Sequence, residues 1–248
     1  MDALAYVINC LISLFSNPVY ASISYTALIF AIATALAIRQ KSLNAQQGIR
    51  LTYAHLAMLL LPLALFSRHM PCNGNLGVCG LIATFSNVII STLISIIVVG
   101  YLFFPLVYPI LYRAKKKMDG SLFAKLEDIS TRLKIKTPKL FIFDSGLPLA
   151  FSVSGLMPAI FISVGMQELL RGKEIDAVLL HELNHLTNST PNLRFLLKIA
   201  QVFSPFYAIM NINPLLAVEE RKADAFVLGV QHTSLYLESA KSKTELDF

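Results

Sequence analysis

Residues 173–186 read KEIDAVLLHELNHL, and this stretch decides the interpretation of the whole chain. Apolar residues recur in it at helical spacing: Ile175, Val178, Leu179, Leu183 and Leu186. Glu174 to Leu186 is therefore predicted to form a helix on which these residues make an apolar face. His181 and His185 are four residues apart, so both imidazoles lie on the same side of that helix. Two imidazoles with this spacing can hold one tetrahedral metal ion.

The chemistry of this helix depends on Glu182, which is next to the first histidine. Such a glutamate does not bind the metal, but it can take a proton from zinc-activated water and pass it to the leaving amine of a peptide bond. The pattern HExxH arises by chance in roughly one chain in a hundred of this length. The alternative is a surface helix with solvated side chains. That alternative leaves unexplained the apolar face and a second acidic pair, Glu220 and Asp224, at helical spacing.

The segments before the helix predict a small α+β domain. Ser121 to Leu133 has the spacing of an amphipathic helix, and Lys139 to Phe143 is a short run of strand-forming residues. Ala150 to Val153 and Ala159 to Val164 are predicted to pair as a hairpin around the linker SGLMP. We therefore expect residues 113–248 to form one catalytic domain that contains a small sheet and the HExxH helix.

From about Phe141 to Leu228 the sequence resembles the membrane gluzincins, namely the HtpX-like proteases and the type-II CAAX prenyl proteases. It is also similar to the beta-lactam-sensor metallopeptidases. The matching features are the hairpin AFSVSGLMPAIFIS, the helix KEIDAVLLHELNHL, the tetrapeptide NPLL and the run ERKADAF. The chain departs from the pattern at Leu149, where the HtpX-like proteins usually carry Asn.

The resemblance implies a zincin-like fold, a zinc cofactor and a role for each of five residues. His181, His185 and Glu220 would ligate Zn²⁺, and Glu182 would be the general base. Asp224 would accept a hydrogen bond from a ligating imidazole and hold its orientation.

The first part of the chain has the composition of a membrane region. The whole chain is 55% hydrophobic and 15% charged, whereas soluble domains carry about 25% charged residues. Within residues 1–112 the formally charged residues are Asp2, Arg39, Lys41, Arg50 and Arg68. We predict an α-helical transmembrane region of about three spans: Val19 to Ile38, Leu51 to Phe66, and a third near Ile82 to Phe104. Ala3 to Phe15 is expected to be an interfacial segment or an extension of the first span.

Basic residues predict the orientation of these spans. Arg39, Lys41 and Arg50 follow the first span and Arg113, Lys115, Lys116 and Lys117 follow the third, whereas the loop between the second and third has only Arg68. Because basic loops stay inside, we expect an integral membrane protein, in the cell membrane, with its catalytic domain in the cytoplasm. The same residues account for most of the net charge of +6, so the expected partner is the lipid bilayer, with no nucleic acid.

A further apolar stretch runs from Leu193 to Leu216. A single crossing there would separate His185 and Glu220 by about 30 Å, and they could not share one ion. Ser204-Pro205 and Asn213-Pro214 provide breaks. We therefore expect a helical hairpin near residues 193–216 that re-enters or lies on the membrane, or else one buried in the catalytic domain.

Two smaller features leave alternatives open. Cys72 and Cys79 bracket the loop CNGNLGVC, where they could form a disulfide or remain free thiols. His232 could donate to a transition state, although an incidental surface histidine is the simpler interpretation.

The expected function is zinc-dependent endopeptidase activity on membrane or membrane-adjacent proteins. The alternative is a membrane signalling or scaffold protein that retains the zincin fold with little turnover. Glu182 favours the enzyme, because a purely structural zinc site has no use for a general base. A channel or transporter is disfavoured, because His55 is the only His, Asp, Glu, Lys or Arg inside the predicted spans.

Overall fold

The computed structural model describes residues 8, 12, 15–39, 43–69, 87–98, 107–112, 115–117, 120–155 and 157–244. The chain divides into two compact units, which are described separately below. The first comprises Met1–Gln40, Gly48–Val98 and Leu196–Asn211. The second comprises Lys41–Gln47, Val99–Phe195 and Ile212–Phe248. Every residue of the candidate zinc site lies in the second unit.

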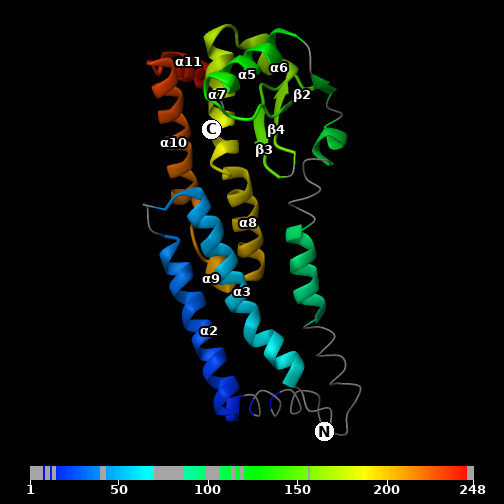
Figure 1. The fold of residues 1–248 in the computed structure, drawn as a ribbon, viewed down its shortest axis with the longest axis vertical. Helices are drawn as coiled ribbons and strands as arrows, with labels where there is room; N and C mark the ends of the chain where they lie inside the picture. Colours follow the sequence, from blue (N-terminus) through cyan, green and yellow to red (C-terminus); the bar gives the residue numbers. More distant parts are fainter. Residues whose placement is uncertain are drawn as a thin grey trace. The chain divides into compact units, whose positions relative to one another are not determined.

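Two long apolar helices dominate the first unit (Figure 1). Helix α2, Pro18–Ala37, begins where the Asn17 side chain accepts hydrogen bonds from the amides of Val19 and Tyr20. Helix α3 runs from Ala45 to His69. Both helices are long and apolar enough to cross a membrane. They coincide with the first two predicted spans, although α3 begins before Leu51.

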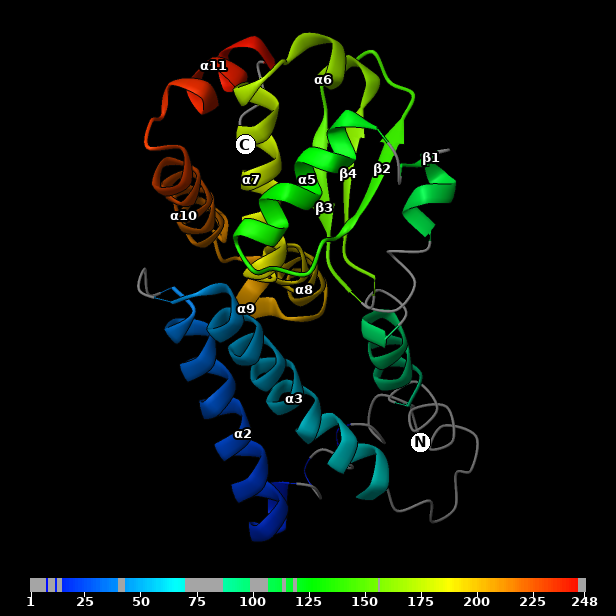
Figure 2. The ribbon, with the colours of Figure 1, turned by 45° about the horizontal axis from the view of Figure 1, so that its top comes forward.

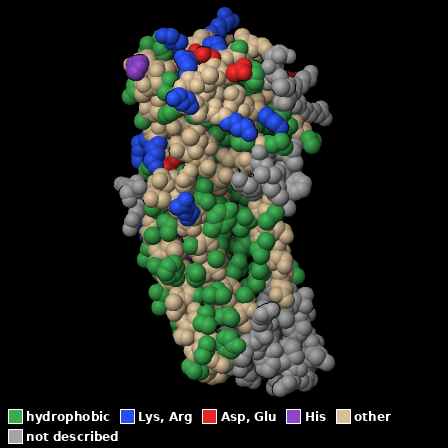
Figure 3. Space-filling model, in the orientation of Figure 1, with side chains coloured by type: hydrophobic (Ala, Val, Ile, Leu, Met, Phe, Trp, Pro, Cys, Tyr) green, Lys and Arg blue, Asp and Glu red, His purple; other side chains and the backbone are tan. Residues whose placement is uncertain are grey.

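Large apolar side chains project outward from α2. Val19, Ile29, Phe30 and Leu36 are all exposed. Figure 3 shows a face on which hydrophobic side chains gather over α2 and α3. Such a surface is costly in water and suits a lipid environment.

The third predicted span is described only in part, as the apolar helix Asn87–Val98. The remainder of Ile82 to Phe104 lies outside the described residues. The same holds for Cys72 and Cys79 and for most of Ala3 to Phe15.

The second unit contains a four-stranded sheet. Its strands are β1 (Lys115–Lys117), β2 (Lys139–Phe143), β3 (Ala150–Val153) and β4 (Ala159–Ser163), in the order β1-β2-β4-β3. β3 and β4 pair antiparallel, as the predicted hairpin requires, whereas β2 and β4 run parallel. The small sheet is thus confirmed. β1, which pairs antiparallel with β2, was not predicted, because three consecutive lysines were interpreted only as a basic cluster.

The two faces of the sheet bury different side chains. Leu140, Ile160 and Ile162 pack with side chains from α5 (Ser121–Arg132) and α7 (Lys173–Thr187) to form the larger core. The opposite face carries Phe141, Phe143 and Phe161, which pack with Tyr108. Figure 2 shows α5 and α7 beside the strands. This packing fixes α7 against the sheet.

Helix α7 is buried on nearly all sides. Its predicted apolar face is confirmed, because it packs in the larger core through Ile175, Val178, Leu179, Leu183 and Leu186. All of its residues from Ala177 to His185 are buried. The reason is that α7 packs against β3, α5, α10 (Asn213–Gln231) and α11 (Leu235–Thr244) (Figures 1 and 2). Gly172 precedes α7 with a φ of 59°, a conformation that favours glycine.

The segment after α7 is broken where the prolines predict. Helix α8, Thr190–Phe203, ends before Ser204-Pro205, and the short α9, Pro205–Ala208, follows. Helix α10 then starts at Asn213-Pro214. In the first unit, Nε2 of the buried His55 lies 2.7 Å from the Ser204 hydroxyl, which ties this break to α3.

Candidate metal centre

Three donor atoms converge on the buried surface of α7. Nε2 of His181 lies 3.0 Å from Nε2 of His185 and 3.2 Å from Oε2 of Glu220. The same carboxylate oxygen lies 3.4 Å from Nε2 of His185. Both histidines are buried, and the Glu220 side chain is 16% exposed. These residues form a group able to hold a metal ion.

The packing of α10 along α7 brings Glu220 to the histidines across 39 residues of sequence. Its neighbour Glu219 points elsewhere, because successive residues on a helix diverge by about 100°. Glu219 is also buried, but its Oε1 pairs with Nζ of Lys222 at 2.7 Å. Of the two adjacent glutamates, the structure therefore brings only Glu220 to the histidines.

Asp224 lies one helical turn beyond Glu220 and reaches the other side of the first imidazole. Its Oδ1 is 3.2 Å from Nδ1 of His181. Both carboxylate oxygens also accept hydrogen bonds from Nζ of Lys241 on α11, at 2.9 and 2.7 Å. A carboxylate in this position favours the tautomer with its proton on Nδ1, which leaves the Nε2 lone pair directed at the cluster.

Burial keeps the two histidines neutral. It lowers the pKa of His181 to about 4, against the opposing effect of the Glu182 charge. Burial likewise lowers the pKa of His185. Near pH 7 both rings therefore present uncharged nitrogen donors, the form in which histidine binds metals.

The geometry of the cluster fits a tetrahedral zinc ion. Zinc bound to nitrogen and oxygen at its usual distances places neighbouring donor atoms about 3.4 Å apart, and the separations here run from 3.0 to 3.4 Å. Lone pairs from two neutral imidazoles and a carboxylate repel one another unless a cation lies among them. Two histidines and one glutamate are also the donor set of a known class of catalytic zinc sites.

Glu182 is on the same helix, and its residue is only 4% exposed. Burial lowers the pKa of His181, His185 and Arg194, and the negative charge of Glu182 opposes this lowering in each. The predicted base is therefore within electrostatic reach of both imidazoles.

Arg194, on α8, is a residue of the cluster that the sequence interpretation missed. Its Nη2 forms an ion pair with Oε1 of Glu220. No recognised motif contains Arg194, and 26 residues separate it from Glu220. Its contribution depends on how α8 and α10 fold back, so the sequence offered no local signal for it.

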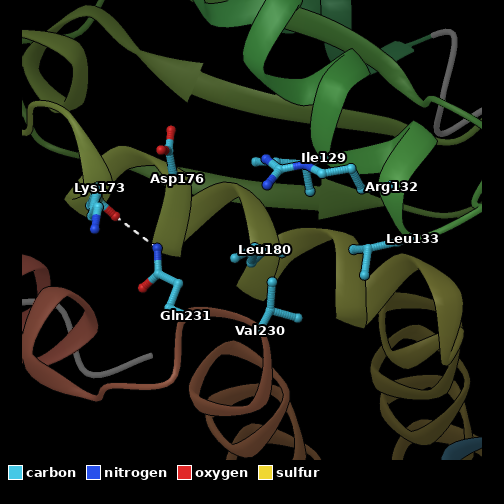
Figure 4. A pocket seen from close by; sticks show the side chains of 8 residues that line it. All are labelled: Ile129, Arg132, Leu133, Lys173, Asp176, Leu180, Val230 and Gln231. Atoms are coloured by element: carbon cyan, nitrogen blue, oxygen red, sulfur yellow. Dashed lines mark hydrogen bonds between the residues drawn. The ribbon is translucent and has the colours of Figure 1, made fainter.

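Two other features lie outside this group. His232 ends α10 in a left-handed conformation and is exposed. A hollow of about 290 Å³ between α5, α7 and α10 is lined by different residues (Figure 4): Ile129, Arg132, Leu133, Lys173, Asp176, Leu180, Val230 and Gln231. Of its charged groups, Arg132 pairs with Asp128 and Asp176 pairs with Lys125, while Lys173 lies over the Tyr236 ring. We therefore assign the hollow no ligand.

Comparisons with known proteins agree with the motifs. The chain is 30% identical over 97 residues to the Protease HtpX homolog of Aeropyrum pernix, and the match covers 38% of this chain. The same match spans 30% of the relative's length, slightly less than a third. No family model matches the sequence. The similarity to an HtpX-type protease confirms the resemblance inferred above.

Among solved structures, the chain is similar to the crystal structure of Ste24p from S. mikatae. The TM-score is 0.44 and the sequence identity is 17%, with 98% of this chain and 65% of that chain covered.

Proposed function

We propose that this chain is an integral-membrane zinc endopeptidase that hydrolyses peptide bonds of membrane or membrane-adjacent proteins. The observation that carries the proposal is the convergence of His181, His185 and Glu220 on a buried helix that also bears Glu182. The similarity to a protein named as an HtpX-type protease supports the same class of reaction.

Each residue of the cluster has a distinct task in this proposal. A zinc ion held by His181, His185 and Glu220 would polarise the peptide carbonyl and acidify a water molecule. Glu182 takes a proton from the attacking water and delivers it to the leaving nitrogen, so one carboxylate acts as base and then as acid. Asp224 keeps the His181 ring turned so that Nε2 faces the metal.

The edge of the sheet supports an extended substrate. Among the described strands, β3 pairs only with β4 and therefore forms an edge. The Ser163 amide donates to the Leu149 carbonyl at 2.9 Å. Because antiparallel pairing alternates, the backbone groups of Ala150 and Ser152 then point away from β4. β3 also packs against α7, so a peptide that adds a strand at this edge would run beside the helix that bears the histidines.

The apolar surfaces support a membrane location. Besides those of α2, the side chains of Val202 and Ile209 are 79% and 88% exposed. A hairpin buried in a protein core would enclose such side chains, so their exposure favours a membrane-associated segment near residues 193–216. We place the catalytic domain in the cytoplasm on the basis of the basic loops.

Cysteine labelling tests this orientation. A cysteine at Ser42 should be shielded from an impermeant thiol reagent in intact cells, whereas one at Asn75 should react. The reverse pattern would place the catalytic domain outside. Replacing Cys10, Cys72 and Cys79 beforehand by serine ensures that the signal comes from the introduced thiol.

The alternative function, a scaffold with little turnover, is less well supported, because such a protein has no use for the buried carboxylate of Glu182. The decisive experiment measures zinc content of the detergent-purified full chain together with cleavage of an unfolded membrane protein. We expect about one zinc per chain, loss of cleavage on chelation, and recovery when zinc is added back. Full zinc occupancy without cleavage would support the scaffold, and absence of zinc would refute the metal centre.

A further inference from the structure

The two carboxylate oxygens of Glu220 contact different residues. Oε2 faces Nε2 of both histidines, at 3.2 and 3.4 Å. The other oxygen, Oε1, pairs with Nη2 of Arg194. We propose that Arg194 holds Glu220 in a one-oxygen mode of metal binding and thereby keeps a coordination position open for water and substrate. This inference rests on the proposed zinc centre.

The number of oxygens that Glu220 offers to a metal ion determines whether a coordination position stays open. A glutamate can offer one oxygen or both, and both oxygens would fill the coordination of a zinc ion that two imidazoles already bind. Catalytic zinc sites instead use three protein ligands and leave the next position open. A cation bonded to Oε1 engages the lone pairs that two-oxygen binding would require.

Arginine suits this task better than a neutral donor. Its guanidinium remains charged under all physiological conditions and donates in a fixed planar geometry. The Arg194 side chain is 45% exposed, so it can hold Glu220 from the solvent side. Arg194 is thus a positioning residue, acting through Glu220.

The test uses Co²⁺ in place of zinc, because the visible absorption of Co²⁺ weakens when its coordination rises from four to five. The wild-type chain is compared with Arg194→Ala, Arg194→Lys and Arg194→Gln. Lys198→Ala is the matched control, because it removes an exposed cation one turn further along α8. Zinc affinity and the separate values of kcat and KM are measured for the same proteins.

We expect Arg194→Ala to show a weaker Co²⁺ band, roughly 10- to 100-fold weaker zinc binding, and a lower kcat with little change in KM. Arg194→Lys should restore most of the wild-type spectrum, because an ammonium group can still hold Oε1. Arg194→Gln, which keeps a donor without the charge, should fall between them. Lys198→Ala should match the wild type.

Wild-type spectra for Arg194→Ala and Arg194→Gln would overturn the proposal. If Arg194→Ala does not fold, the Lys and Gln variants decide, because a wild-type spectrum for Arg194→Gln would by itself show that the charge is not needed. A wild-type chain that binds Co²⁺ but cleaves nothing would refute the endopeptidase function and leave the spectral comparison valid. A wild-type chain that binds no metal would overturn both.

Discussion

Oδ1 of Asp224 lies 3.2 Å from Nδ1 of His181, while Nε2 of the same ring lies 3.2 Å from Oε2 of Glu220. Two carboxylates one helical turn apart on α10 therefore lie within 3.2 Å of the two different nitrogens of one imidazole. Glu220 completes the group of donor atoms, and a carboxylate in the position of Asp224 favours the His181 tautomer with its proton on Nδ1.

Asp224→Ala should weaken zinc binding by about 10- to 100-fold, because the His181 ring loses the group that fixes its tautomer and orientation. Zinc affinity measured by competition with a chelator checks this. Asp128→Ala is the control, since Asp128 is an exposed partner of Arg132 on α5. Equal affinities for the two variants would mean that Asp224 serves only to bind Lys241.

The adjacent glutamates of α10 should behave differently. Glu220→Ala should lose zinc and activity, because it removes a donor atom. Glu219→Ala should keep the metal, because that side chain pairs with Lys222 instead. Metal analysis of both purified variants decides the matter, and an empty Glu219→Ala beside a full Glu220→Ala would refute the assigned ligand.

Glu182→Gln should retain zinc while its kcat falls by about 10²- to 10⁴-fold, because the amide cannot carry the proton. Glu168→Gln, on the exposed surface of α6 (Val164–Leu169), provides a control of identical chemistry. Cleavage at the wild-type rate by Glu182→Gln would remove Glu182 from the mechanism.

Ser152→Pro should raise KM for a protein substrate with the fold intact, because the Ser152 amide points away from β4 and toward the free edge. Phe151→Pro is the matched comparison. Its amide belongs to the β3–β4 ladder, so this variant should lower the melting temperature instead. An unchanged KM in a folded Ser152→Pro protein would argue against strand addition at this edge.

The metal-free protein should lose stability as the pH falls from about 6.5 towards 4. Burial lowers the pKa of His181 in the folded chain to about 4, from a usual value of 6.5. In that window the unfolded chain binds a proton that the folded chain does not, so acid favours unfolding, and the stabilisation is complete above pH 6.5. Thermal melts of protein treated with a chelator, recorded at a series of pH values, test this. The dependence of the melting temperature on pH should be weaker in His181→Gln. His185, whose pKa burial also lowers, should retain part of this dependence, so only an unchanged dependence in this variant would contradict the assignment to His181.

The sequence alone determined the features that depend on local spacing. A spacing of four positions, as between His181 and His185, places both rings on one side of any α-helix, whatever surrounds it. The two long apolar helices and the β3–β4 hairpin also follow from runs of residue types close together in the chain. The prolines after Ser204 and Asn213 likewise located the breaks between α8, α9 and α10.

Tertiary structure decided everything that joins distant segments. The parallel pairing of β2 with β4 and the addition of strand β1 depend on hydrogen bonding between segments that are distant in the sequence. The meeting of Glu220 and Arg194 with the histidines depends on α10 returning along α7. Sequence patterns report which face of an element is apolar, whereas the partner of that face is selected by side-chain packing across the whole unit. For that reason the two histidines could be paired from sequence alone, and the arginine beside Glu220 could not.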